Sequence, residues 1–357
     1  MRKDRTFIDI HIIQTLPPSN INRDDTGSPK TAQYGGVIRA RVSSQSWKKA
    51  IRDYFYKYND LENIGVRTYD IVNYLTKEIQ RLKPSLSEEK ALKLADQTFK
   101  ASGIETAGNM AKALFFISKN QRDALAQAAI EGEKGKTKLQ SILNENPSID
   151  IALFGRMVAI KGQPLNIDAS AQVAHAISTH QVSNEYDFFT AVDDIKRLES
   201  QGAGFLDTIE YNSSTLYRYA NVAAHELLNQ LGSVEDTVGA IRLFVEAFAK
   251  SLPTGKVNTF ANQTLPQAIL VTIRDDRPVN LVSAFEEPVR SNDGYVEKSI
   301  TKLLKEEEKV LKFVNKPLHT YYITMADMGE KIEGEYDTFE ELLNEFSKDL
   351  EANLKDR

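Results

Sequence analysis

The sequence has no cysteine, so it forms no disulfide bonds and offers no thiolate ligands to a metal. No apolar run reaches membrane-spanning length, and residues 1–9 lack the apolar core of a signal peptide. Nucleotide-binding, zinc-protease and serine-hydrolase motifs are also missing, and the five histidines have no ligand spacing. We therefore expect a soluble, cytoplasmic, non-enzymatic protein without a cofactor or metal.

The 357 residues are 41% hydrophobic, which is enough for a sizeable core and roughly two domains. The net charge of −5 excludes a generally basic nucleic-acid coat. Charge is unevenly spread, however. Residues 1–58 carry 11 Lys and Arg against 5 Asp and Glu, and the remainder carries 34 against 45. This asymmetry places any nucleic-acid-binding surface in the first segment.

Residues 22–52 form the most informative stretch. Alternation over residues 37–42 predicts a strand with Arg39 and Arg41 both facing away from the core, as candidate RNA contacts. The serines at 43, 44 and 46 then predict a helix start whose N–H groups and dipole favour an anion. Lys48 and Arg52, one turn apart, add positive charge, while Trp47 begins a stripe that we expect in the core. The pattern predicts a site for a phosphate chain.

Elsewhere the patterns predict a scaffold. We expect His11 to be structural, loops over 17–34 and 131–138, and a Thr338 and Glu341 capping box for a solvated acidic helix. The remaining expected elements are strands over 7–14, 149–154, 173–182, 216–222, 268–274 and 320–325, and helices over 69–82, 87–100, 225–231, 234–252 and 300–313. The charged helical segments within residues 61–146 indicate an insertion.

Residues 184–211 contain an aromatic segment between strands. Two adjacent phenylalanines, Phe188 and Phe189, cannot both face one core from a strand. One of them is therefore available to wedge between bases or contact a partner. An ordinary hairpin with one partly exposed Phe explains these residues equally well.

Asp24 and Asp25 are the one carboxylate pair with catalytic potential, as Mg²⁺ ligands or as a base. The simpler interpretation makes them salt-bridge partners of Arg23 and Lys30.

Several ordered blocks carry a resemblance to a known family. The blocks are residues 22–25, 35–36, 41–46, 150–157, 174–182, 189–194 and 217–221. The chain resembles the CasC-type backbone subunits of the type I-E CRISPR surveillance complex Cascade, which belong to the Cas-seven family. The resemblance covers roughly residues 5–60 and 147–290, and is loose in the helical insertion and the acidic C-terminus.

The resemblance implies an α+β, hand-shaped fold. An RRM-like (ferredoxin-like) palm would comprise residues 1–60, 147–182 and 216–357, the last with the C-terminal helices. Helical fingers would be inserted at 61–146, and a β-hairpin thumb would span 183–215.

The resemblance also implies a role in antiviral defence. Copies would stack head to tail along a CRISPR RNA as a helical filament and present it for pairing with target DNA. Other partners would be the large, small, RNA-processing and handle-binding Cascade subunits. The implied RNA contacts are Arg23, Ser43, Gln45, Lys48, Lys49, Arg52 and Met157, and the implied thumb-tip wedge is Phe188, Phe189, Thr190 and Val192.

Two other functions remain open from the sequence. One is a metal-dependent RNA nuclease that uses Asp24 or Asp25. The other is a structural filament subunit that assembles without nucleic acid.

Overall fold

The computed structural model describes residues 5–58, 64–158, 164–191, 205–329, 332 and 334–356. The chain divides into two compact units. Unit 1 comprises Met1–Asp53, Val173–Asn221 and Arg242–Arg357, and unit 2 comprises Tyr54–Gln172 and Val222–Ile241. Both helices and a large sheet are present, so the predicted α+β class is confirmed.

One large sheet organises unit 1. Its strand order is β13-β12-β1-β11-β9-β3-β2, with β8 and β10 also pairing with β11. The pairs β1–β12, β12–β13, β11–β9, β9–β3, β3–β2 and β10–β11 are antiparallel. The strands are β1 Phe7–Ser19, β2 Thr31–Tyr34, β3 Val37–Val42, β8 Ala171–Val173, β9 Ala176–Ser178, β10 Glu185–Ala191, β11 Phe205–Ala223, β12 Ala268–Arg274 and β13 His319–Thr324.

Strand β1 is buried on both faces. Ile8, Ile10 and Ile12 lie on one face, while Asp9 and His11 are buried on the other. The predicted strand is therefore confirmed. Because both faces of β1 are buried, the alternation of its residues separates an apolar face from a polar face, and neither face is exposed to solvent. His11 is structural, as predicted, because its ring stacks on two buried tyrosines of β11.

Helices cover this sheet. The helix α10 (Val296–Val310) contacts β1 and the 3₁₀ helix η2 (Leu281–Phe285), and α11 (Phe339–Lys355) contacts β13. The capping box of Thr338 and Glu341 is confirmed. The expectation of a solvated C-terminal helix is wrong, since α11 buries an apolar face at Leu342, Leu343, Phe346, Leu350 and Leu354. Helices α1 (Ser44–Tyr58) and α8 (Val234–Lys250) and the single-turn helix α9 (Val257–Phe260) also have residues in unit 1.

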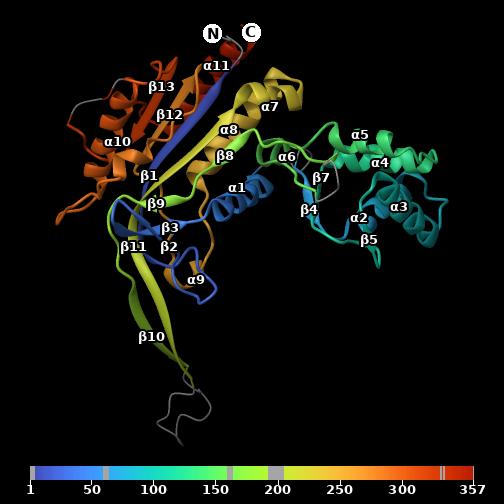
Figure 1. Ribbon diagram of the computed structural model, residues 1–357, viewed down its shortest axis with the longest axis horizontal. Helices are drawn as coiled ribbons and strands as arrows, with labels where there is room; N and C mark the ends of the chain where they lie inside the picture. Colours follow the sequence, from blue (N-terminus) through green and yellow to red (C-terminus); the bar gives the residue numbers. More distant parts are fainter. Residues whose placement is uncertain are drawn as a thin grey trace, which may run out of the picture. The chain divides into compact units, whose positions relative to one another are not determined.

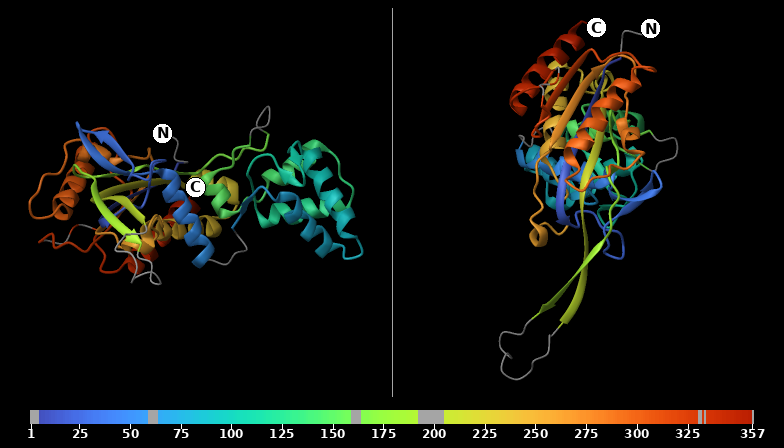
Figure 2. Two further views of the ribbon diagram at one scale, coloured as in Figure 1. Left: turned by 90° about the horizontal axis from the view of Figure 1, so that it is seen from below. Right: turned by 90° about the vertical axis from the view of Figure 1, so that its left-hand side faces the viewer.

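Strands β10 and β11 continue as a two-stranded ribbon beyond the other strands of the sheet (Figure 1). Figure 2 shows the same ribbon from the side. Among the described residues, strand β10 pairs with β11 alone. The described part of this ribbon therefore has little core of its own.

Unit 2 is mainly helical, with a core of its own formed by helices α2 to α5. Its helices are α2 Ile71–Leu82, α3 Glu88–Ser102, α4 Lys119–Ile130, α5 Lys136–Asn144, α6 Ile149–Phe154 and α7 Ala224–Leu231. Two small sheets join β4 (Val66–Thr68) to β7 (Phe115–Ile117) and β5 (Thr106–Ala107) to β6 (Met110–Ala111).

The strand predicted over residues 149–154 is wrong, because this segment is the helix α6. Ser148 precedes it in an extended conformation, and Gly155 ends it with a φ of 76°. The buried Asp150 carboxylate accepts hydrogen bonds from the Gly65 N–H (2.8 Å) and the Ser148 hydroxyl (2.7 Å). The apolar run is short and fully buried, so its periodicity does not distinguish a helix from a strand.

Three other expectations need correction. The loop over 17–34 includes the end of β1 and the short strand β2, which pairs with β3. The run over 173–182 is divided between β8 and β9, because residues 174–175 are not in either strand. The loop over 131–138 is shorter than expected, since α5 already begins at Lys136.

None of the helices in the described part of the chain is both long and apolar enough to span a bilayer.

Candidate nucleic-acid interface

Helix α1 begins at the surface of unit 1 with a capped first turn. The Ser43 hydroxyl accepts a hydrogen bond from the Ser46 N–H (3.3 Å), and the Ser43 N–H donates to Asn22 Oδ1 (2.8 Å). The start of this helix was predicted to favour an anion. One of its N–H groups, that of Ser46, already has a partner within the protein, the Ser43 hydroxyl. The Ser44 and Gln45 N–H groups have no partner within the helix, because they belong to its first turn.

The residues of α1 divide between the core and the surface as the helical spacing predicts. Trp47 and Ile51 are fully buried, which confirms the core assignment of the aromatic stripe. Gln45 and Lys49 are exposed, while Lys48 and Arg52 are half-buried. Burial lowers the pKa of Lys48 because it desolvates the charged ammonium. Lys49 is thus the most exposed of the three predicted cations of α1.

Arg39 does not lie where the strand pattern predicted. Its side chain is 0% exposed, and the guanidinium donates to three backbone carbonyls: those of Tyr34 (3.2 Å), Ser178 (2.9 Å) and Phe285 (2.8 Å). Instead, Ile38 is 47% exposed. These carbonyls lie at the ends of β2, β9 and the 3₁₀ helix η2, and a guanidinium with five donors is well matched to them. The prediction that Arg39 faces away from the core is wrong, and so is its role as an RNA contact.

Arg41, two residues further on, does remain near the surface. Its Nε donates to the Thr31 carbonyl (3.1 Å), and one of its terminal nitrogens lies 3.2 Å from His175 Nδ1. Burial and the charges of Arg41 and Lys30 lower the pKa of His175, so this histidine is neutral at pH 7. Arg41 and Lys30 border the same small cavity of about 20 Å³.

The loop between β1 and β2 is compact. Lys30 N–H donates to the Asn22 carbonyl (2.9 Å), and the Asp24 carboxylate accepts from Thr26 N–H (2.9 Å) and Ser28 N–H (3.0 Å). Hydrogen bonds, first from the Thr26 hydroxyl, lower the pKa of Asp24. Asp24 therefore stabilises its own loop, and the salt bridge to Arg23 or Lys30 that the sequence suggested is not formed. No group of three or more His, Cys, Asp or Glu residues in the described parts of the chain is arranged to hold a metal.

A groove of about 340 Å³ lies between this loop and α1. It brings the predicted contacts Arg23 and Lys49 together with Ser46. Its third wall is the loop over residues 252–255, which the sequence did not indicate. Gly255 packs so closely there that an added Cβ would lie 2.3 Å from the Ile21 carbonyl oxygen. A glycine can indicate that another backbone segment approaches closely, but nothing in the sequence identified Ile21 as the residue that Gly255 contacts.

A buried arginine supports α1 from inside. The guanidinium carbon of Arg218 lies 3.8 Å from the centre of the Trp47 ring and 4.5 Å from that of Phe248. Arg218 also donates to the Gln14 side chain and the Phe248 carbonyl. Burial lowers the pKa of Arg218 to about 9, so the guanidinium stays charged at pH 7. A cation stacked on the single tryptophan fixes the inner face of the helix that carries the surface lysines.

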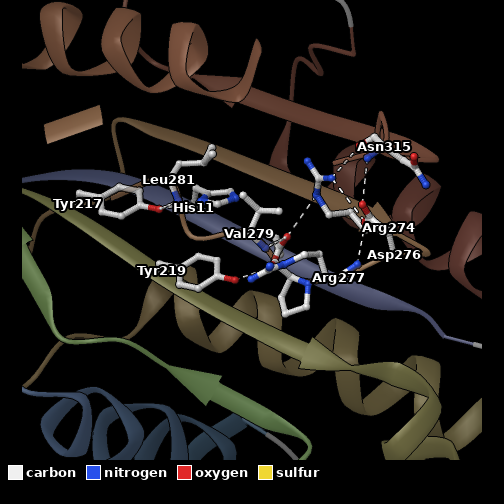
Figure 3. A network of polar contacts seen from close by, with 11 residues as sticks. His11, Tyr217, Tyr219, Arg274, Asp276, Arg277, Val279, Leu281 and Asn315 are labelled. Atoms are coloured by element: carbon white, nitrogen blue, oxygen red, sulfur yellow. Dashed lines mark hydrogen bonds and ion pairs between the residues drawn. The ribbon is translucent and has the colours of Figure 1, made fainter. Parts of the chain in front are cut away.

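A second buried network fixes β1, β11 and β12 relative to one another (Figure 3). The Asp9 carboxylate accepts from the Tyr219 hydroxyl (2.7 Å) and the Val279 N–H (2.9 Å), and lies 3.4 Å from Arg274 Nε. The Tyr217 hydroxyl contacts His11 Nδ1 (2.9 Å) and accepts from the Leu281 N–H (3.0 Å). Burial raises the pKa of Asp9 to about 6 and lowers that of His11 to about 3. These residues connect the strands of the sheet, and none of them lines the groove.

The hairpin of β10 and β11 exposes aromatic side chains. Phe188 and Phe189 are 67% and 39% exposed, and Tyr186 is 60% exposed. Phe188 lies opposite Thr208, and Phe189 lies opposite Asp207. Thr190 is part of β10, whereas Val192 lies outside the described residues. Neither Phe188 nor Phe189 therefore lies in a core.

Met157, the remaining predicted contact, belongs to unit 2 and is 87% exposed. A methionine this exposed contributes little to its own unit, which fits a contact with another molecule.

Comparisons with known proteins give the class of the molecule. A chain titled "CRISPR RNA-guided surveillance complex, pre-nicking" is 31% identical, with a TM-score of 0.84 over 96% of this chain and 100% of that chain. A second, titled "CRISPR RNA-guided surveillance complex", is 27% identical, with a TM-score of 0.75 over 96% of this chain and 99% of that chain. None of the curated proteins matches this chain.

The family follows from a second comparison. A family model described as "CT1975-like protein" matches residues 8–346. The chain belongs to this family, and its predicted membership of the Cas-seven family of CRISPR surveillance-complex subunits is confirmed.

Proposed function

We propose that this chain is a non-catalytic backbone subunit of a type I-E Cascade complex that holds a CRISPR RNA by its phosphates. The observation that carries the proposal is the surface of unit 1 formed by the start of α1 and the adjoining groove. There Gln45, Lys48 and Arg52 share one side of the helix, and Lys49 meets Arg23 across the groove. The likeness to chains of RNA-guided complexes supports it.

The chemistry of this surface suits a guide of any sequence. Cationic side chains, hydroxyls and the N–H groups of a helix start bind phosphates, which are the same for every nucleotide. Such contacts leave the base edges available for pairing with a target strand. The free energy of binding is then used to hold the guide in an ordered conformation, which lowers the entropic cost of pairing.

The units and the hairpin support the predicted parts of the hand. We assign the palm, with an RRM-like arrangement of its central strands, to unit 1, and the fingers to the helical core of unit 2 within residues 61–146. The thumb is the hairpin within residues 183–215. Copies of the chain stack head to tail. Each contact joins two different surfaces of the chain, and because these contacts do not close into a ring, they give a helical filament. The exposed Phe188 and Phe189 wedge into the guide and target duplex, and Met157 contacts bases.

Reversing three charges tests the RNA contact. In the variant Lys48→Glu, Lys49→Glu and Arg52→Glu, we expect retention of RNA to be lost while the fold persists. The three residues lie beyond the first turn of α1, where the helix dipole has little effect, so the substitutions do not weaken α1 through its dipole. Copurifying RNA, measured from the ultraviolet absorbance ratio and the size of the extracted nucleic acid, gives the result, with circular dichroism as the check on folding.

The matched control reverses three exposed lysines that belong to α10 and the segment after it: Lys305, Lys312 and Lys316. This variant has the same net charge but should keep its RNA. Unchanged RNA retention in the α1 variant, or an equal loss in the control, would reject the proposed interface.

A further inference from the structure

The groove beside α1 has an unexpected charge balance for a phosphate site. Two cations, Arg23 and Lys49, line it together with two carboxylates, Asp24 and Asp53. Lys49 lies 2.5 Å from Asp53, and both side chains remain largely exposed, at 74% and 51%. A surface selected only to hold phosphates gains nothing from a carboxylate at its edge, because like charges repel.

The two carboxylates are not equivalent. The Asp24 carboxylate is already used by Thr26 and Ser28 in its own loop. Asp53 has Lys49 as its partner, and a carboxylate has lone pairs for several donors, so it can accept from a ligand as well. Three hydrogen bonds hold Asp24 Oδ1 to its own loop, whereas Asp53 is held by Lys49, so we take Asp53 as the acceptor for a bound molecule.

A ribose is the part of an RNA chain that matches this acceptor. Its 2′-hydroxyl donates a hydrogen bond, whereas deoxyribose has no donor there. The groove, at about 340 Å³, falls within the size range of small-molecule pockets, which begins near ~300 Å³. Ser46 and Thr254 add hydroxyls to the lining, and the close contact between Gly255 and Ile21 fixes the outer wall.

We propose that this groove receives one ribonucleotide of the bound strand and that Asp53 distinguishes RNA from DNA by accepting the 2′-hydroxyl. Arg23 and Lys49 bind the adjoining phosphate, and the Lys49 ammonium holds the Asp53 carboxylate in place. The inference rests on the proposed RNA-binding function, and it adds the sugar as the feature that the site recognises.

The test measures binding of the full chain to three oligonucleotides of one sequence: RNA, DNA and 2′-O-methyl RNA. We expect the wild-type protein to favour RNA, because neither of the other two strands has a 2′-hydroxyl donor. In Asp53→Ala we expect the preference for RNA over DNA to fall about tenfold, the value of one charge-assisted hydrogen bond. DNA binding should strengthen at the same time, since Lys49 is released.

Two further variants separate the hydrogen bond from the charge. Asp53→Asn keeps an oxygen acceptor, so most of the preference for RNA should remain. Asp25→Ala removes the same charge from an exposed aspartate that does not line the groove, so the RNA-to-DNA ratio should not change.

The possible results are distinguishable. The inference is overturned if Asp53→Ala has the same ratio of RNA affinity to DNA affinity as the wild type, or if Asp25→Ala changes this ratio equally. Either result leaves the proposed RNA binding intact. A wild-type protein that binds none of the three strands overturns both.

Discussion

The interior and the surface of unit 1 use the same residue types for different purposes. Arg39 and Arg218 are fully buried and donate to backbone carbonyls, whereas Arg23 is exposed and lines a groove. A buried guanidinium joins segments that are distant in the chain, because its five donors reach several acceptors at once. An exposed guanidinium remains available to a ligand. The residue type alone therefore does not indicate which arginines are available to a ligand.

Arg39 and Arg41 give the sharpest test of this difference, since they are two residues apart on β3. We expect Arg39→Met to lower the free energy of unfolding by about 3–5 kcal/mol, because three buried carbonyls lose their partner. Arg41→Met should cost under about 1 kcal/mol, since its contacts are near the surface. Urea unfolding of both variants measures the difference. Equal losses would show that burial does not separate the two arginines.

The two aspartates Asp9 and Asp24 repeat the comparison with opposite pKa shifts. Burial raises the pKa of Asp9 from 3.8 to about 6, so the folded state binds its proton more tightly than the unfolded state. Its contribution to stability is therefore largest below pH 3.8 and is lost as the pH rises through 6. Hydrogen bonds lower the pKa of Asp24, so its contribution is present above pH 3.8 and is lost as the pH falls further.

Unfolding measured between pH 4 and 6 should therefore separate the two. As the pH falls from 6 to 4, we expect the wild-type protein to gain about 2 kcal/mol relative to Asp9→Asn. Asn keeps an acceptor for Tyr219, and the comparison cancels other groups such as His11. Asp24→Asn should differ from the wild type mainly below pH 4. A constant difference between the wild type and Asp9→Asn across this range would contradict the pKa assigned to Asp9.

Local patterns were enough to predict many of the elements. The prediction of β12 over residues 268–274 agrees with the structure at both ends, and so does that of β3 over 37–42. Helix α7 ends at Leu231, as predicted, and the glycine that follows, Gly232, adopts the left-handed conformation of a helix C-cap. These features depend on a few neighbouring residues.

Other features depended on contacts between distant segments. The burial of Arg39 is determined by Ser178 and Phe285, far away in the sequence. The groove is completed by the loop over 252–255, and Arg218 meets Trp47 only in the folded sheet and helix. The periodicity of a sequence carries no information on contacts between distant segments. The Lys and Arg residues of α1 could therefore be predicted, but the residues around them could not.

The smallest and most specific of the predicted effects concerns an exposed aromatic ring of the hairpin. Trp47 is buried against Arg218, whereas Phe188 is 67% exposed on the hairpin and should add little to stability. In Phe188→Ala we expect normal folding and normal guide binding, but target engagement about tenfold weaker, since one aromatic contact with a base is lost. Binding of a complementary target strand to the guide-loaded protein measures this.

The control Phe313→Ala removes a ring that is 92% exposed elsewhere on unit 1 and should leave target binding unchanged. An equal loss in the control would mean that any exposed ring has this effect, and loss of folding in Phe188→Ala would place the ring among structural residues.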